Sequence, residues 1–507
     1  MNNKVFKIIV ILLCILNIYL LLYKLGDIPR GIHVDEAGSY YDALCLVRYG
    51  VDRFLYKYPV YLVNFGGGQS ALYTYLACLF FKLLGNSLWS FRLVAVIINL
   101  ISYYFYYKLM YKYKNKFSAI ITLLLLTILP VFIMKARWGM DCYLLCPLLI
   151  ISFYWYCKAI SSKKNLYFII SGILFGITLY TYAISYLIVF LFIVFSFVYL
   201  LIMKKISIKN IISMCIPLGI FAFPLILMIL LNKGIIKNEI ITSFFSVPRL
   251  WMYRGGEVSL SNFKYFFNNF KFYFFKDELS YNFIDGFGTV YYFSIVLIFL
   301  GFIISVIRVI KNKSNIFNNL MLGLFLIILL VCSLVYDMNI NKANAIFICF
   351  VYFIVLFFEY LYSNKYRFVI VICLILYLFN FLRFCDSYFI DNSNKINRLF
   401  VDLSLYDAID YADSVRSDDG YIFINTVQGY IHVLINNDVD PYDFNNNSII
   451  YKDNYSIWGY NYYRFSYSYQ LNYKNVYILN SDSCRIDNYV ANGFKKKKIG
   501  EYVVLFN

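Results

Sequence analysis

The sequence has little charge: only 15% of its 507 residues are Asp, Glu, Lys or Arg, while 62% are hydrophobic. Soluble domains usually hold about 25% charged and roughly 45–50% apolar residues. A soluble fold has no way to hide so much apolar surface from water, so the composition excludes an ordinary soluble protein. It predicts a chain that lies in a lipid bilayer. The 53 Tyr residues suit the headgroup level, where one end of the ring is dry and the other wet.

No continuous basic stripe of the kind that binds nucleic acid occurs, although the formal net charge is +18. The Lys and Arg residues fall in short clusters between apolar runs. This pattern is typical of cytoplasmic loops and of contacts with anionic lipid. We therefore expect membrane lipids as partners and no nucleic acid.

Metal-binding patterns are also missing. The chain has two histidines, His33 and His432, and neither a C-x-x-C pair nor the spacing of a zinc site. Most of the 12 cysteines lie in apolar runs, where Cys behaves as a small hydrophobic residue. The sequence predicts structural cysteines and no certain cofactor, and a divalent metal stays open as an alternative.

Long apolar runs dominate the first three quarters of the chain. A helix that crosses a membrane needs about 20 mostly apolar residues. The sequence predicts eleven such spans, at residues 7–23, 88–107, 117–135, 142–158, 166–181, 184–203, 210–231, 290–309, 317–336, 345–362 and 368–385. The shorter apolar stretch 70–84 follows Gly66, Gly67 and Gly68 and is expected to form an interfacial or re-entrant helix.

The Lys and Arg clusters predict the orientation of these spans, because cytoplasmic loops are enriched in both residues. With Lys4 and Lys7 in the cytoplasm, every second loop is basic. The chain is then a multi-pass protein of the cell membrane with a cytoplasmic N-terminus. Loops 24–87 and 232–289, the turns 136–141 and 337–344, and the region 386–507 are extracytoplasmic.

The region 386–507 is polar and rich in Asn and Tyr. D-L-S-L-Y-D-A-I-D-Y-A-D-S-V has the pattern of an amphipathic helix, and Y-I-F-I-N, N-V-Y-I-L-N and E-Y-V-V-L-F have the pattern of strands. We therefore expect two domains: a helical polytopic transmembrane domain at 1–385, with outer loops 24–87 and 232–289, and a small extracytoplasmic α/β domain at 386–507.

Three carboxylates crowd into G-I-H-V-D-E-A-G-S-Y-Y-D-A, which runs from Gly31 to Ala43. Asp35 and Asp42 are seven residues apart and would share one face of a helix. Asp35 is also well placed to cap a helix that starts near Glu36. The motif therefore allows two interpretations: a capped helix with solvated acids, or a reactive site at the mouth of the membrane bundle.

Two short outer turns carry the remaining candidates. In K-A-R-W-G-M-D, Arg137 and Asp141 are four apart. Snorkelling of Lys135 to the membrane surface explains that residue but not Asp141. D-M-N-I-N-K-A-N carries Lys342, whose point charge suits phosphate, and amides that suit sugar hydroxyls. These amides, which also favour ordinary turns, belong to Asn339, Asn341 and Asn344.

The middle of the spans holds almost no ionisable residues. Transporters driven by protons or ions usually need buried acids near the midplane. The sequence collects its charges at the outer face, which favours chemistry at the outer leaflet over passage through the membrane.

At this point the motifs resemble a known family. H-V-D-E-A-G-S-Y-Y-D-A resembles the acidic motif of the GT-C membrane glycosyltransferases, in the bacterial group of family 39, the protein O-mannosyltransferases and the aminoarabinose transferases. R-W-G-M-D resembles their second outer motif. Y-N-F-I-D-G-F-G-T-V-Y-Y-F-S and N-I-N-K-A-N resemble later segments. The resemblance extends from residue 1 to about 385 and implies a GT-C-like fold.

The resemblance also implies a function: transfer of a sugar, with inversion, from a polyprenyl-phosphate-linked donor to a hydroxyl or amine. Asp35 matches the family's catalytic acid position and Glu36 the neighbouring acid. Arg137 matches a position that meets the donor phosphate. Lys342 stands where related bacterial chains tend to carry Arg, so bidentate phosphate binding would be lost there.

Elementary chemistry agrees with these roles, because a carboxylate takes the proton of an acceptor as the new bond forms. The leaving phosphate gains charge that Arg137 and Lys342 would stabilise. We expect substrate contacts from five more residues: Asp42, Asp141, Asn339, Asn341 and Asn344. The acceptor, in the cell envelope, is a protein, a cell-wall polymer or a glycolipid. Two alternatives stay open: a lipid or polysaccharide flippase or polymerase, and a non-catalytic membrane-anchored binding protein.

Overall fold

The computed structural model describes residues 3–270, 274–275, 279–311, 313, 315–336, 338–391, 399–451, 456–465 and 471–507. The chain forms two compact units. The first contains residues 1–28, 92–226 and 255–393, and the second contains residues 29–91, 227–254 and 394–507.

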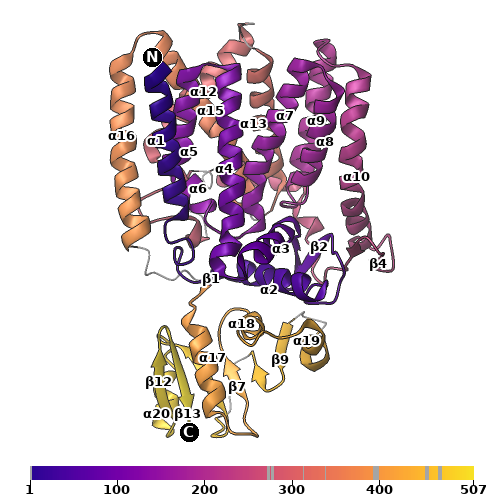
Figure 1. The fold of residues 1–507 in the computed structure, drawn as a ribbon, viewed down its shortest axis with the longest axis vertical. Helices are drawn as coiled ribbons and strands as arrows, with labels where there is room; N and C mark the ends of the chain where they lie inside the picture. Colours follow the sequence, from indigo (N-terminus) through magenta and orange to yellow (C-terminus); the bar gives the residue numbers. More distant parts are fainter. Residues whose placement is uncertain are drawn as a thin grey trace. The chain divides into compact units, whose positions relative to one another are not determined.

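Nine helices in the described part of the chain are long and apolar enough to cross a membrane, and most of their length lies in the first unit. Figure 1 shows them side by side. They are built on α1 (Asn3–Leu22), α4 (Leu88–Tyr113), α7 (Leu145–Ser162), α9 (Ser185–Ile202), α10 (Ile208–Asn232), α12 (Tyr292–Ile310), α13 (Ile316–Leu334), α15 (Phe347–Ser363) and α16 (Arg367–Asp386).

Shorter helices complete the first unit. They are α5 (Lys116–Ile128), α6 (Pro130–Lys135), η1 (Asp141–Leu144), α8 (Asn165–Thr178), η2 (Gly255–Glu257), η3 (Leu260–Tyr265), α11 (Phe266–Phe270), η5 (Ser280–Asn282), α14 (Ile340–Ala343), η6 (Asn344–Ile346) and η7 (Ser387–Asp391). The helical polytopic fold class is thus confirmed.

Two of the eleven predicted spans are shorter than predicted. The run 117–135 is divided into α5 and α6 because Leu129 takes an extended backbone and Pro130 starts a new helix. Proline has no N–H to donate and its fixed φ suits the first position of a helix. The run 166–181 ends as a helix at Thr178, where tight turns follow. An apolar run indicates which residues avoid water, but not where the helix within it is interrupted.

Close packing of backbones holds the bundle together. A side chain added at Gly301 of α12 would overlap the backbone of Phe353 in α15. Lipid tails are as apolar as the helices, so the hydrophobic effect does not drive helices together in a bilayer. Close approach at small residues, and the dispersion contacts that it allows, does so instead. Gly301 is therefore a packing position.

The second unit contains a seven-stranded sheet in the order β12-β13-β11-β7-β10-β9-β8. β7 pairs in parallel with β10 and β11, and the other neighbours are antiparallel. The strands are β7 (Ile422–Ile424), β8 (Ser448–Tyr451), β9 (Ser456–Tyr460), β10 (Tyr463–Arg464), β11 (Val476–Asn480), β12 (Lys495–Ile499) and β13 (Tyr502–Phe506). The helices beside it are α17 (Ser404–Val415), α18 (Gly429–Asn436), α19 (Pro441–Asn447) and α20 (Ile486–Ala491).

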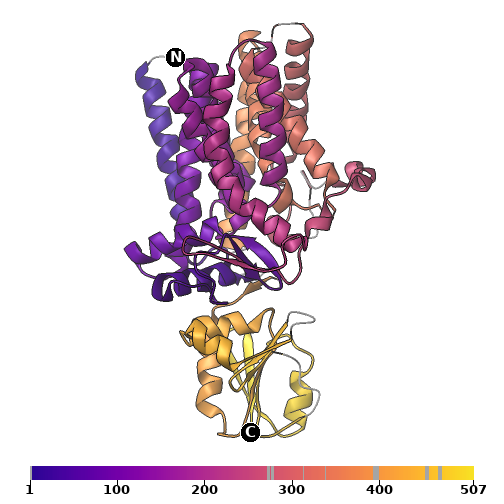
Figure 2. The same cartoon turned by 90° about the vertical axis from the view of Figure 1, so that its right-hand side faces the viewer.

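Successive side chains of β11 point to opposite faces of this sheet, and each face has its own core. Val476 and Ile478 belong to the larger core, which also contains residues of α17 and α18. Tyr477 and Leu479 belong to a second core with α20. Figure 2 shows the sheet edge-on between its helices. The predicted α/β character of the C-terminal region, with its helix and its three strands, is confirmed.

The acidic motif belongs to the same unit as the C-terminal sheet. β1 (Ile32–His33) pairs antiparallel with β6 (Phe400–Val401), and Ala37 and Tyr41 of α2 (Val34–Tyr49) belong to the larger core. The unit also holds β2 (Tyr61–Asn64), β3 (Gly67–Ser70), α3 (Leu72–Leu84), β4 (Ile240–Ile241) and β5 (Ser246–Val247). The grouping differs from the predicted domains, since residues 29–91 pack with the C-terminal region. In the stretch 70–84, α3 covers Leu72–Leu84.

Replacing Gly31 with Ala is expected to loosen this attachment. Gly31 has φ +79°, and a Cβ there would lie 2.5 Å from the Val401 carbonyl oxygen. Gly50 also has a positive φ, +73°, but open space around it. Left-handed strain costs about 1–2 kcal/mol in both variants, and the overlap adds to it only at Gly31. The free energy of unfolding in detergent should therefore fall further for Gly31→Ala than for the control Gly50→Ala. Equal losses would contradict the role of the β1–β6 contact.

Candidate functional site

His33, not Asp35, caps α2. The His33 Nδ1 atom accepts a hydrogen bond from the Asp35 N–H at 3.1 Å, and Glu36 Oε2 accepts one from the His33 N–H at 3.1 Å. This reciprocal pair is a capping box with histidine in the place of serine or threonine. The cap predicted at Asp35 is therefore wrong by two residues. The Asp35 carboxylate does not cap the helix. It lies on the first turn, where the helix dipole favours a negative charge.

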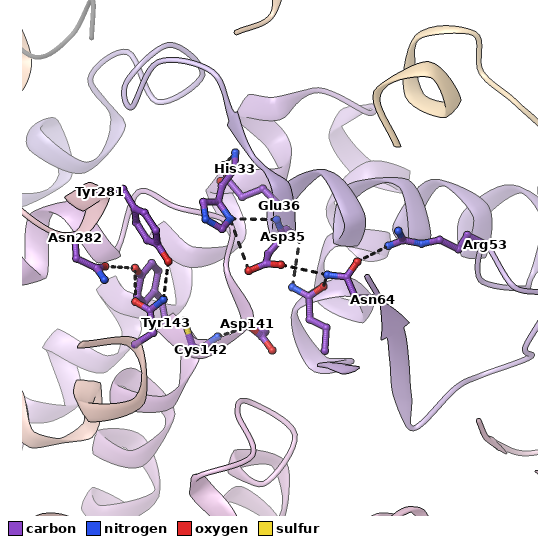
Figure 3. Close-up of polar contacts among 12 residues, drawn as sticks. His33, Asp35, Glu36, Arg53, Asn64, Asp141, Cys142, Tyr143, Tyr281 and Asn282 are labelled. Carbon is purple, nitrogen blue, oxygen red and sulfur yellow. Dashed lines mark hydrogen bonds and ion pairs between the residues drawn. The ribbon is translucent and has the colours of Figure 1, made fainter. Parts of the chain in front are cut away.

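Asn64 holds the Asp35 side chain. Its Nδ2 atom lies 3.4 Å from Asp35 Oδ1 and donates to Gln69 Oε1 at 2.9 Å. Its Oδ1 atom accepts from Arg53 Nη2 at 3.2 Å. Figure 3 shows the three side chains in a row, with Asn64 between Asp35 and Arg53. The hairpin of β2 and β3 thus sets the position of the acid.

Arg53 anchors the row through a buried ion pair. Its Nε and Nη2 atoms donate to the two oxygens of Asp42 at 2.9 and 2.7 Å, and both residues are fully buried. Its Nη1 atom donates to the Tyr430 hydroxyl of α18 at 3.1 Å. Bidentate pairs of this kind combine strong charge-assisted hydrogen bonds with fixed geometry. Arg53 was not identified from the sequence. The available signal was Asp42, an acid eleven residues earlier in a strongly apolar region with no evident partner in the sequence.

The three acids of the motif therefore have different surroundings. Glu36 and Asp42 are buried and engaged, the first in the cap and the second with Arg53. The Asp35 side chain keeps 40% of its surface exposed. A catalytic role for Glu36 and a substrate contact for Asp42 stay predictions, and these contacts favour structural roles. Asp35 is the accessible carboxylate of the three.

The C-terminal region fixes the motif from several sides. Arg30 donates to Asp402 at 2.7 Å and to Glu501 at 3.0 Å, and the Tyr41 hydroxyl donates to the Val439 carbonyl at 2.7 Å. Together with the β1–β6 pairing, these contacts place α2 in a single orientation on the sheet domain.

Arg137, in the first unit, caps the end of α1. Its guanidinium donates to the main-chain carbonyls of Leu20, Leu21 and Tyr23 at 2.6–2.9 Å and to that of Ile28 at 3.0 Å. These acceptors lie at or just beyond the C-terminus of α1, where carbonyls lack helical partners. Burial lowers the pKa of Arg137. The geometry favours a structural role, and the phosphate contact predicted for Arg137 stays a prediction.

In the first unit, η1, which begins at the end of the predicted turn 136–141, meets the predicted turn 337–344. The Tyr143 hydroxyl lies 2.8 Å from Asn282 Oδ1 and 3.0 Å from Asn341 Oδ1, and Asn341 Nδ2 donates to the Tyr281 hydroxyl at 3.0 Å (Figure 3). Asn344 Nδ2 donates to the Cys142 carbonyl. The turns that carry Asn341, Asn344 and Tyr143 thus form one polar cluster.

Asp141 and Asn339 both serve the local backbone. Asp141 Oδ1 accepts from the Cys142 N–H at 2.7 Å. Asn339 caps α14 by accepting from the Lys342 N–H at 3.1 Å. Their predicted substrate contacts stay predictions. Asp337, the first residue of the predicted motif, lies outside the described residues.

Lys342 is nearly buried and faces an acid. Its Nζ atom lies 3.0 Å from Glu257 Oε2 and 3.1 Å from the Tyr336 carbonyl oxygen. The Lys342 side chain is 10% exposed and that of Glu257 is 29% exposed. Lys342 is thus a nearly buried cation in contact with a partly exposed carboxylate, and its predicted phosphate contact stays a prediction.

A metal centre has no ligand set in the residues that the structure describes: no group of three or more His, Cys, Asp or Glu side chains is placed to hold an ion.

A family model matches part of the chain. The model of the dolichyl-phosphate-mannose-protein mannosyltransferase family matches residues 69–231. The comparison with curated proteins gives no match.

Solved structures match nearly the whole chain. ArnT from Cupriavidus metallidurans in the apo state is 9% identical, with a TM-score of 0.57, and the match covers 98% of this chain and 97% of that one. ArnT bound to undecaprenyl phosphate is 10% identical, with a TM-score of 0.55 and the same coverage. The apo oligosaccharyltransferase of Archaeoglobus fulgidus is 11% identical, with a TM-score of 0.50, and the match covers 87% of this chain and 64% of that one. The fold is that of the GT-C glycosyltransferases, which confirms the resemblance.

Gly38→Ala is expected to destabilise the protein. Ala is the better helix former by about 1 kcal/mol, so propensity alone predicts a gain. However, a Cβ at Gly38 would overlap Asn64 Oδ1 and lie 2.8 Å from Arg53 Nη2. Overpacking of this kind costs about 1–3 kcal/mol. Chemical unfolding in detergent measures the sign. The control Ser39→Ala adds no volume in the same helix turn and should be close to neutral; a stabilised Gly38→Ala would contradict the packing.

The stability of the second unit should fall as pH rises, because of Asp52. This acid is buried beside Asp42, and burial, followed by the Asp42 charge, raises its pKa from 3.8 to about 8. Between these values the folded chain keeps a proton that the unfolded chain has lost. Unfolding then releases a proton, so the free energy of unfolding decreases as pH rises and levels off above about 8. Thermal midpoints measured across the range should show this slope in the wild type and in the exposed control Asp418→Asn, and a flatter profile in Asp52→Asn.

Proposed function

We propose that this GT-C protein is a glycosyltransferase that moves a sugar from a polyprenyl-phosphate-linked donor to an acceptor at the extracytoplasmic face, with Asp35 as general base. The observation that carries the proposal is the state of Asp35. Its carboxylate is accessible, is not used as a cap, and is held by Asn64. The proposed topology has a cytoplasmic N-terminus and an extracytoplasmic C-terminal domain in the cell membrane.

The reaction follows from the chemistry of the donor. An acceptor hydroxyl or amine is a weak nucleophile at neutral pH, and a carboxylate within hydrogen-bond reach removes its proton as the new bond forms. The acceptor atom bonds to the anomeric carbon while the bond from that carbon to the phosphate oxygen breaks. A single displacement through an oxocarbenium-like state inverts the configuration. Asp35 holds the released proton, and the polyprenyl phosphate leaves with the bonding electrons.

Lys342 is the residue that we propose for the donor phosphate. The leaving group gains negative charge in the transition state, and a buried cation stabilises that charge more strongly than an exposed one. In the structure the Lys342 ammonium group forms an ion pair with the Glu257 carboxylate. In the proposed mechanism the donor phosphate replaces the carboxylate of Glu257, which has enough exposure to swing away. Asn341 and Tyr143 are the proposed contacts to sugar hydroxyls, since both belong to the polar cluster next to this turn.

The acceptor is proposed to lie in the cell envelope, as a protein, a cell-wall polymer or a glycolipid. Undecaprenyl phosphate is the lipid bound by the ArnT structure that this chain resembles. The donor class proposed here is therefore a sugar on a lipid carrier of that kind, with membrane lipids around it.

Asp35→Asn should abolish sugar transfer while the protein remains folded. Loss of a general base typically lowers the rate about 10²–10⁴-fold, and Asn keeps the size of the side chain and its contact with Asn64. The assay follows release of undecaprenyl phosphate from a panel of undecaprenyl-phosphate hexoses in membranes that contain the protein. Mass spectrometry of envelope glycans, with and without the protein, identifies the product.

Asp27→Asn is the matched control, because Asp27 is an exposed acid a few residues earlier in the same loop. It should keep wild-type transfer. If Asp35→Asn also kept full activity, the general-base role would be rejected. If deleting the protein left every envelope glycan unchanged, the transferase itself would be rejected.

A further inference from the structure

A second cluster of charge lies at the end of the bundle where α1 begins. There Lys114 follows α4, Arg308 is in the last turn of α12, and Glu359 is in the last turns of α15. Lys116 donates to Asn3 at 2.6 Å, which places this cluster beside the N-terminus. The candidate site described above does not use these residues.

One carboxylate serves two cations in this cluster. Glu359 Oε2 lies 3.5 Å from Lys114 Nζ and 3.7 Å from Arg308 Nη1. The Lys114 side chain is only 5% exposed. Burial is the largest effect on the pKa of Lys114 and lowers it; the Glu359 charge raises it and the Arg308 charge lowers it, with a lower pKa as the net result. Two basic groups share one acid here, so the cluster has more basic than acidic side chains, in a place where water screens charge poorly.

A polar cavity of about 190 Å³ opens onto the cluster, and Lys114, Arg308, Lys313, Asn315 and Glu359 line it. A water molecule occupies about 30 Å³ of liquid, so the cavity has room for a larger polar group. Three cations and one acid line it. The N-terminus of α13, capped by Asn315, adds the positive end of a 19-residue helix.

A larger cavity of about 840 Å³ adjoins the first, and the two share Tyr113 and Asn315. Most of its lining is apolar, with Ile160, Phe317 and Leu320 among the residues. A cationic polar chamber joined to a mainly apolar one matches a molecule with a phosphate head and hydrocarbon tails. Basic residues near a membrane surface attract anionic lipid for the same electrostatic reason.

We propose that these joined cavities bind one anionic glycerophospholipid, with its phosphate between Lys114, Arg308 and Lys313 and its acyl region in the apolar chamber. The lipid belongs to the leaflet at this end of the bundle, which the proposed topology makes the cytoplasmic one. Its phosphate supplies the negative charge that Glu359 alone does not, and it ties the ends of α4, α12, α13 and α15 together.

Lipid binding to the full chain in detergent tests this proposal. Native mass spectrometry compares dioleoyl phosphatidylglycerol with dioleoyl phosphatidylcholine, which has the same tails and no net charge. We expect one phosphatidylglycerol to bind about tenfold more tightly than phosphatidylcholine, and Arg308→Gln and Lys313→Gln to weaken it about tenfold each. Lys313 is exposed, so its variant should fold even if Arg308→Gln does not.

Lys209→Gln is the matched control: it removes an exposed cation at the same end of the bundle, outside both cavities, and should bind like the wild type. Equal binding of the two lipids, or equal binding by all variants, would overturn the proposal. If inorganic phosphate alone displaced phosphatidylglycerol, the site would be one for a free anion and not for a lipid. Tighter, variant-sensitive binding of undecaprenyl phosphate would replace the glycerophospholipid with a polyprenyl one. The outcomes do not depend on sugar transfer, so they separate from a failure of the proposed function.

Discussion

The candidate site depends on one buried ion pair, between Arg53 and Asp42. The Arg53 guanidinium donates hydrogen bonds to Asp42 of α2, Asn64 of β2 and Tyr430 of α18. A charge in a dry interior that loses its partner costs about 3–5 kcal/mol, so the three elements cannot separate without exposing or neutralising it. Asn64 transmits that constraint to Asp35. The accessible acid is therefore positioned by a cation that it does not itself touch.

Because charged side chains are scarce, those with structural contacts can be told apart from one that remains accessible. With so few ionised side chains, most of those at the ends of the helices have a clear local task. Arg137 satisfies carbonyls at the end of α1, and Glu36 completes the cap of α2. Such tasks are costly to leave undone in an apolar environment. Asp35 is not a cap, keeps 40% of its side chain exposed and lies 3.8 Å from His33 Nδ1, so it is the exception that invites a chemical role.

Local patterns in the sequence predicted what local forces decide. The apolar runs, α17 and strands β7, β11 and β13 follow from periodicity and composition. Long-range contacts were beyond such reasoning: Ile32 pairs with Val401, and Arg137 reaches carbonyls more than 100 residues earlier. The grouping of the acidic motif with the C-terminal sheet follows from those contacts. The cap was missed for a different reason, because histidine is an unusual N-cap and Asp35 fits the common rule better.

Helix α15 separates the two cationic sites of the first unit. Lys342 lies just before it and Glu359, shared by Lys114 and Arg308, in its last turns. The 17 residues of α15 are about 25 Å long, close to the hydrocarbon thickness of a bilayer. No Asp, Glu, Lys, Arg or His interrupts Phe347–Phe358, and most of that stretch is buried. The two clusters therefore lie near opposite ends of this helix. Along Phe347–Phe358 the described helix offers no charged side chain between the two proposed phosphate sites, which favours a protein that works on lipids in place over one that moves them across.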